Sequence, residues 1–164
     1  MLGDLSKRMK DQELVLRFWA FFRFDYRHPE NKKEIASFLD KAMEEIKKGN
    51  DAYRKNFKEK YSEAIHRCCQ LLGKSGFEKD RLSDARKRSK NATLFEVWMV
   101  TLAKLTESDF QRLLSKQVAF QAKARALLED GEFFNAISYS TQEKDHVEKR
   151  YKKVKALIAE VLND

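Results

Sequence analysis

Residues that break helices are scarce in this sequence, which has one proline and five glycines among 164 residues. A β-sandwich or β-barrel needs many turns, and turns are built largely from these residues, so such folds are disfavoured. A chain of this length can bury a substantial core within one domain. We therefore expect an all-α protein, a compact orthogonal or irregular bundle of about six to seven helices forming a single domain over residues 1–164.

Cysteine is also scarce, because the neighbours Cys68 and Cys69 are the only two. Adjacent residues of a helix are poorly placed to bridge to each other, and no CxxC pair is present to bind zinc. We therefore expect reduced thiols in a cytoplasmic protein. The sequence lacks an apolar run of about 18 residues and an apolar segment after its first residues, so we expect neither a membrane span nor a signal peptide.

Sequence motifs of the common enzyme classes are missing as well. There is no GxxxxGK[ST], GxGxxG, HExxH or GxSxG, the signatures of phosphate, dinucleotide, zinc and hydrolase sites. His66 and Cys68 cannot form a nucleophile pair, because positions two apart on a helix point about 200° away from each other. We predict no catalytic residue, no metal ligand and no cofactor, and hence a protein that is not an enzyme. An enzyme with an unrecognised site in a helical-bundle pocket stays an alternative.

The stretch from Asp11 to Tyr26 is apolar around nearly the whole circumference of a helix, and such a helix is normally packed on every side. We predict that it is the central helix, with Asp11 as its N-cap and Glu13 paired with Arg17 one turn later. A second apolar segment, capped by Asn91, is the other buried helix. Together these two segments supply the predicted core residues: Leu14, Phe18, Trp19, Phe22, Phe95 and Trp98.

Apolar residues at helical spacing predict the remaining helices. They cover 32–48, 51–72 and 109–128, and a last helix follows a capping box of Ser140 and Glu143, while 132–138 is expected as a connecting turn. In the third of these helices Val118 is predicted to face the core. In the helix over 51–72, His66 and Arg67 fall outside the apolar stripe.

Positive charge is concentrated in one part of the chain. The formal net charge is +8, and the stretch 51–90 holds twelve basic and six acidic residues. Its densest part gives the residues predicted to contact DNA phosphates: Arg81, Arg86, Lys87, Arg88 and Lys90. Cations grouped in this way bind a nucleic-acid backbone with steep salt dependence and little sequence preference. The competing interpretation is that they only keep the surface soluble.

Several stretches resemble one protein family. RMKDQELVLRFWAF (8–21), followed by a tyrosine and then SFLDKAMEE (37–45), resembles the helical region of a large prokaryotic family. This family is the domain of unknown function number 262, which includes the GmrS portion of GmrSD-type restriction enzymes. NATLFEVWMV (91–100) and the stretch 133–154 are similar to its succeeding helices, so the resemblance extends from residue 2 to about residue 154.

The resemblance implies a part in defence against modified or foreign DNA. In that family an N-terminal ParB-like domain carries a DGQQR-type motif tied to nucleotide hydrolysis, and relatives often add an HNH-type nuclease module. Neither is present in this sequence, so no catalytic residue can be carried over. The opening MLGDLSKRM looks like the middle of such a protein. We expect an excised domain, a truncated gene or a split subunit.

The function expected from the resemblance is that of a non-catalytic helical domain that scaffolds the nucleotide-hydrolysing and nuclease modules and contacts DNA phosphates. Its expected partners are DNA and the missing ParB-like domain, in cis or in trans, and no membrane. If that domain normally covers Leu2 and Leu5, we expect a homodimer through the surface left open. The alternative is an independent helical protein–protein adaptor that binds no nucleic acid.

Overall fold

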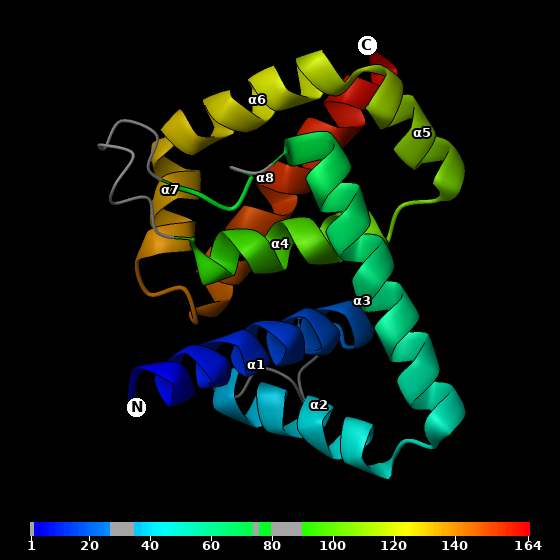
Figure 1. The fold of residues 1–164 in the computed structure, drawn as a ribbon. Coiled ribbons are helices and arrows are strands. Elements are labelled where there is room, and N and C mark those ends of the chain that lie inside the picture. Colours follow the sequence, from blue (N-terminus) through cyan, green and yellow to red (C-terminus); the bar gives the residue numbers. More distant parts are fainter. Residues whose placement is uncertain (1, 27–34, 74–75, 80–89) are drawn as a thin grey trace.

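The computed structural model describes residues 2–26, 35–73, 76–79 and 90–164, with the backbone alone for 2–10 (Figure 1). These ranges contain helices and no strand, which confirms the all-α prediction. Eight helices occur there, more than the predicted six to seven. They are α1 (Leu2–Arg23), α2 (Ile35–Lys48), α3 (Asp51–Leu72), α4 (Ala92–Ala103), α5 (Glu107–Ser115), α6 (Gln117–Glu129), α7 (Gly131–Ser138) and α8 (Lys144–Asn163).

The helix predicted over 109–128 is in fact two helices, because a turn at Lys116 separates α5 from α6. Lys116 has φ −108° and ψ 26°, outside the helical region, so the single periodic pattern assumed for 109–128 does not continue through it. Val118, predicted to face the core, is therefore 83% exposed, while Phe120 and Ala124 are buried. The stretch after Asp130, predicted as a turn, forms α7.

Polar side chains mark where helices begin. Asn50 Oδ1 accepts a hydrogen bond from Tyr53 N at 2.9 Å and caps α3, and Asp130 Oδ1 accepts one from Phe133 N at 2.8 Å and caps α7. Such a cap satisfies a backbone N–H that has no partner inside the helix. The predicted box of Ser140 and Glu143 is wrong, because Glu143 caps α8 without a side-chain bond.

Helix α4 lies at the centre of the fold (Figure 1), with every residue from Thr93 to Ala103 buried. Helices α1, α3, α7 and α8 all pack against it. The predicted central helix, α1, is buried mainly over 17–21. It begins at Leu2, so Asp11 lies within it and is not its N-cap. The prediction made α1 the central helix, but α4 is the more deeply buried of the two.

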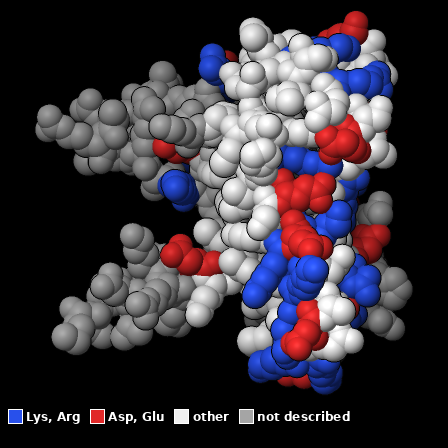
Figure 2. All heavy atoms as spheres, turned by 45° about the vertical axis from the view of Figure 1, so that its right-hand side comes forward, with Lys and Arg blue, Asp and Glu red and all other residues white. Residues whose placement is uncertain are grey.

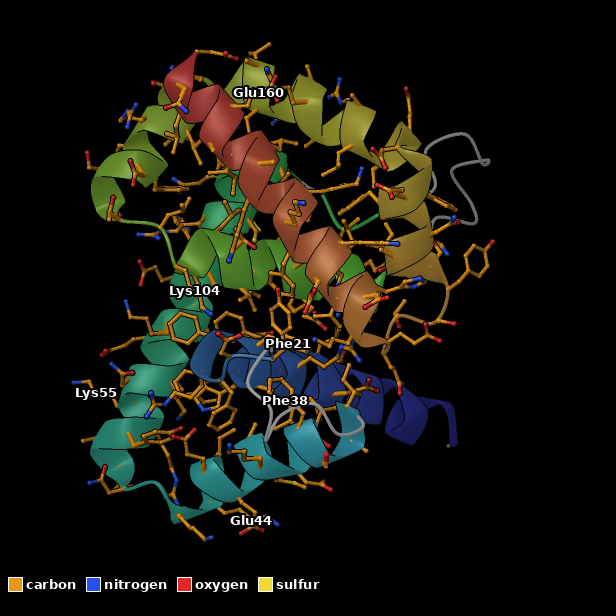
Figure 3. The ribbon with its side chains drawn as sticks, turned by 180° about the vertical axis from the view of Figure 1, so that it is seen from behind. Phe21, Phe38, Glu44, Lys55, Lys104 and Glu160 are labelled. Carbon is orange, nitrogen blue, oxygen red and sulfur yellow. The ribbon has the colours of Figure 1, made fainter. Side chains whose placement is uncertain are left out.

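Aromatic rings join α1 to α2 and α3. Phe21 of α1 meets Phe38 of α2 with ring centroids 4.9 Å apart, and Figure 3 shows the two side chains between these helices. Trp19 lies on another side of α1, where its Nε1 donates to Tyr53 Oη of α3 at 2.7 Å and its ring centroid lies 4.7 Å from that of Phe57. Ring pairs of this geometry add to the free energy gained from burial alone.

Both cysteines lie on α3 as free thiols, Cys68 buried and Cys69 exposed. Burial raises the pKa of the Cys68 thiol far above its ordinary value, so this thiol stays protonated. Among the described residues no helix is both long and apolar enough to cross a bilayer.

Asn91 is predicted to stabilise the fold more than a simple helix cap. Its Oδ1 accepts from Leu94 N at 2.7 Å, and its Nδ2 donates to Ile137 O of α7 at 2.9 Å. We expect Asn91→Ala to lower the free energy of unfolding by about 2–3 kcal/mol, measured by urea denaturation. The matched control Asn50→Ala removes an exposed cap alone and should cost about 1 kcal/mol. Equal losses in the two variants would contradict the double role of Asn91.

Candidate functional site

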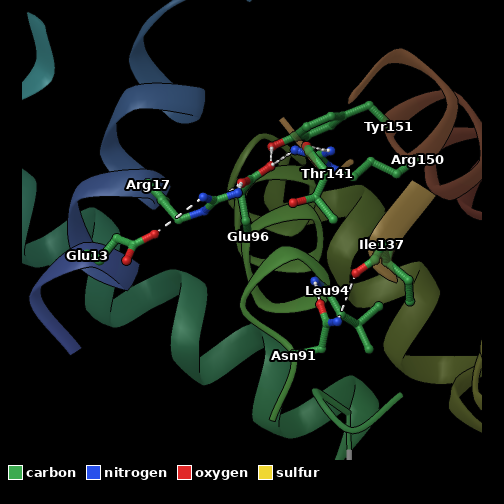
Figure 4. A network of polar contacts seen from close by, with 9 residues as sticks. All are labelled: Glu13, Arg17, Asn91, Leu94, Glu96, Ile137, Thr141, Arg150 and Tyr151. Atoms are coloured by element: carbon green, nitrogen blue, oxygen red, sulfur yellow. Dashed lines mark hydrogen bonds and ion pairs between the residues drawn. The ribbon is translucent and has the colours of Figure 1, made fainter. Parts of the chain in front are cut away.

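The most concentrated group of buried charges in the described part of the chain surrounds Glu96, at the middle of α4 (Figure 4). Its side chain is fully buried. Glu96 Oε2 accepts from Arg17 Nε of α1 at 3.0 Å and pairs with Arg17 Nη2 at 2.7 Å. Glu96 Oε1 accepts from Arg150 Nη2 of α8 at 2.8 Å and from the Tyr151 hydroxyl at 3.3 Å. We call these four residues the Glu96 cluster.

Arg150 is fully buried, which is rare for an arginine unless it is paired. Besides Glu96 it reaches Thr141 O, to which its Nη1 donates at 2.7 Å. Its guanidinium carbon also lies 5.8 Å from the ring centroid of Phe21, within cation–π range. The side chain therefore links α8 to α4, to α1 and to the turn before α8.

The charges of the Glu96 cluster stabilise one another. Burial alone would lower the pKa of Arg17, but the carboxylates of Glu96 and Glu13 raise it, so that it lies above the ordinary value. Burial, reinforced by the negative charge of Glu96, raises the pKa of Tyr151 well above its usual range. Tyr151 therefore keeps its proton and donates a hydrogen bond to the carboxylate. The predicted pair of Glu13 and Arg17 is confirmed, at 3.4 Å.

The geometry limits what Glu96 can do chemically. An ionised carboxylate has about four lone-pair sites, and Glu96 accepts three hydrogen bonds and forms a further ion-pair contact with Arg17 Nη2. To accept a proton from a substrate, it would first have to lose one of these contacts inside the core. The arrangement therefore joins α1, α4 and α8 rather than holding a base ready for a substrate.

A second buried arginine, Arg67 of α3, closes the far end of α4. Its Nη1 donates to Leu102 O in the last turn of α4 at 2.9 Å and to Leu105 O, just beyond that helix, at 3.0 Å. Its Nη2 pairs with Glu63 at 2.7 Å and with Glu107 of α5 at 2.8 Å. Arg67 therefore supports the core, although the sequence pattern placed it outside the apolar stripe.

The predicted core residues lie on α1 and α4. Phe18, Trp19, Phe95 and Trp98 are buried, with 0 to 8% of their surface exposed. Leu14 and Phe22 are half-buried and pack against the same cluster. The structure brings these residues together, but it also places the buried charges of Glu96 and Arg150 beside them, and these two residues were absent from the prediction.

Of the predicted phosphate-contacting residues, Lys90 alone lies within the described residues. Arg81, Arg86, Lys87 and Arg88 lie outside them. Lys90 is exposed, and its backbone forms an antiparallel bridge with Glu78. It lines a groove of about 700 Å³ between α1, α3 and the start of α4.

The sequence holds one weak signal for the Glu96 cluster, which the prediction of an apolar core did not take into account. Glu96 is the one charged residue in α4, ATLFEVWMVTLA. A charged side chain in the middle of so apolar a helix has either a way to solvent or a buried partner. Arg150 and Tyr151 give no comparable signal, because α8 carries many other basic residues.

Comparison with known proteins gives no relative for this chain: no protein-family model, no curated protein and no solved structure matches it.

The Glu96 cluster makes a stability prediction. Glu96→Gln removes the negative charge and leaves two buried guanidiniums facing a neutral amide, so we expect the free energy of unfolding to fall by about 3–5 kcal/mol in urea denaturation. Glu13→Gln, which alters the exposed partner of Arg17, should cost less than about 1 kcal/mol. Replacing the buried charges together, by Arg17→Met, Glu96→Leu and Arg150→Met, should recover much of the loss. A cost below about 1 kcal/mol for Glu96→Gln would contradict this account.

Proposed function

We propose that this chain is the non-catalytic helical domain of a GmrSD-like DNA-defence protein, which scaffolds the nucleotide-hydrolysing and nuclease modules. The observation that supports a scaffold is the Glu96 cluster. Its charge pairs join α1, from the first part of the chain, to α4 and to α8, from the last part. Arg67 likewise joins α3 to α4 and α5. Buried, directional bonds of this kind hold helices in one fixed relation, which a scaffold between two modules requires.

We further propose that the basic run Arg81, Arg86, Lys87, Arg88 and Lys90 contacts DNA phosphates. The ion pairs of α3 support the choice of this run over α3 itself, because several basic side chains of α3 already have acidic partners. Arg54 pairs with Asp51 at 3.4 Å and Lys60 with Glu63 at 3.0 Å. Figure 2 accordingly displays blue and red side chains mixed over this side of the molecule. Residues 73–90, which follow α3, hold seven basic and three acidic residues, so most of the excess positive charge of the stretch 51–90 lies there.

One observation favours the alternative, an adaptor that binds a protein partner and no nucleic acid. The groove that Lys90 lines is otherwise mainly apolar, with Leu14, Ile65 and Phe95 among its walls. Apolar grooves between helices are common docking sites for peptides. The acidic Asp11 and Glu13 also line this groove and would repel a phosphate near Lys90.

Binding to duplex DNA separates the two functions. We expect fluorescence anisotropy of labelled DNA across a salt series to show steeply salt-dependent binding. Changing Arg86, Lys87, Arg88 and Lys90 to Gln should reduce the slope of log K against log salt by about three to four, because each phosphate contact contributes about 0.9.

A control variant with the same change in net charge makes this test specific. It carries Lys47, Lys48, Lys55 and Lys58, which are exposed on α2 and α3, changed to Gln. This control should keep a slope within about one unit of the native value. An equal loss in both variants would show unspecific attraction, and no binding of the native chain at low salt would favour the adaptor. A gene for a ParB-like protein with a DGQQR motif directly upstream would support the scaffold.

A further inference from the structure

A second feature of the core goes beyond the proposed scaffold role. A cavity of about 340 Å³ lies between the end of α1, the end of α4 and the second half of α8. Its inner wall is formed by buried side chains, among them Phe21, Val100 and Ile158. The exposed residues Asp25, Lys104, Lys155 and Ala159 also line it, so the cavity reaches the surface there. Its volume falls near the lower end of the range for small-molecule pockets, about 300–1,000 Å³.

Aromatic rings form one side of this cavity. Tyr151 stacks on Tyr26 with centroids 5.2 Å apart and planes 26° apart, and on Phe21 with centroids 5.8 Å and planes 22° apart. Because the Tyr151 hydroxyl donates to Glu96, this ring is held in place by the Glu96 cluster. A preformed wall of rings suits a planar aromatic ligand, since stacked and edge-on ring pairs are favourable.

A polar group without a partner also borders the cavity. Thr101 is 5% exposed and lines it, and its Oγ1 is buried with no hydrogen-bond partner in the part of the chain described. A buried hydroxyl destabilises a fold unless something satisfies it. A threonine in a helix takes either of two χ1 rotamers, so a rotation can turn this hydroxyl toward a ligand.

The charges at the opening indicate the sign of the ligand. Among the described residues that line the opening, Lys104 and Lys155 are basic and Asp25 is acidic. Lys104 Nζ donates to Phe21 O at 3.0 Å, and Figure 3 shows Lys104 near Phe21 between α1 and the end of α4. Lys155, by contrast, has no acidic partner within 4.0 Å among the residues that the structure describes. It is therefore placed to pair with an anionic group at the opening.

From these observations we propose that the cavity binds a small aromatic acid. The ring lies against Phe21 and Tyr151, the Thr101 hydroxyl bonds a polar atom of the ligand, and the carboxylate pairs with Lys155 at the surface. The site is independent of the DNA contact proposed above, because none of the basic residues of 81–90 lines it.

The test is a titration with 2-naphthoate, followed by ¹H–¹⁵N NMR shifts and by its own fluorescence. We expect saturable binding with the largest shifts at the end of α1, the end of α4 and the second half of α8. The neutral 2-naphthamide should bind at least about 3-fold more weakly, because it lacks the charge that pairs with Lys155. Shifts centred elsewhere, or no saturable binding up to the solubility limit of the acid, would overturn the proposal.

Four single substitutions locate the site. Ala159→Phe places a ring in the cavity and should abolish binding, whereas Thr101→Val keeps the shape of the side chain and should weaken binding about 5-fold. Lys155→Gln should weaken binding about 2- to 5-fold, and its control Lys152→Gln, on an exposed residue of the same helix outside the cavity, should leave it unchanged. Far-ultraviolet circular dichroism checks that each variant is folded. Native-like binding by folded Ala159→Phe would overturn the proposal.

The Thr101→Val variant offers a second readout that does not depend on the ligand. Removing a buried, unpartnered hydroxyl should raise the midpoint of thermal unfolding of the ligand-free protein by about 2–4 °C. Added 2-naphthoate should stabilise the native chain more than this variant. A lower midpoint for the variant would show that the hydroxyl already has a partner, and would remove Thr101 from the proposed site.

Discussion

The rest of the fold depends on a single carboxylate in its most buried helix. An isolated charge at the centre of α4 would be very costly, so Glu96 is compatible with folding only where Arg17 and Arg150 reach it from opposite directions. This requirement fixes how α1 and α8 cross α4. Apolar contacts alone would tolerate a shift of these helices by a residue, whereas two guanidiniums on one carboxylate would not. The cluster therefore contributes a defined arrangement more than it contributes net stability.

The ends of α4 obey the same constraint of satisfying polar groups inside a core. At its start, Asn91 accepts a hydrogen bond from a backbone N–H and donates one to a carbonyl of α7. At its end, Arg67 donates hydrogen bonds to two backbone carbonyls. Since α4 is buried along its length, water cannot readily serve these groups. Side chains from neighbouring helices replace it, and each of them also ties a neighbour to α4. The buried hydroxyl of Thr101 in α4, in contrast, has no hydrogen-bond partner among the described residues.

The apolar pattern of the sequence predicted the all-α class, the positions of α2, α3 and α4 and the core residues Phe18, Trp19, Phe95 and Trp98. The spacing of apolar residues shows which side of a helix is apolar, and this was enough to predict these helices and core residues. It failed at Lys116, where a helix ends without glycine or proline, because a turn of one residue leaves a plausible stripe through Val118. It also failed for Arg67 and Arg150, since pattern alone cannot separate a buried, paired arginine from a solvated one. The cavity forms where α1, α4 and α8 meet, so the sequence of no single helix could predict it.

The bridge between Glu78 and Lys90, reinforced by the hydrogen bond from Asn91 N to Phe77 O at 2.8 Å, has a consequence for how this protein can vary. It brings two points of the chain, twelve positions apart, side by side next to the start of α4. These bonds hold the end of the chain that follows α3 beside the start of α4. Doubling a loop adds only about 0.6 kcal/mol of closure entropy. A longer stretch between these two points would therefore cost the bridge itself little in closure entropy.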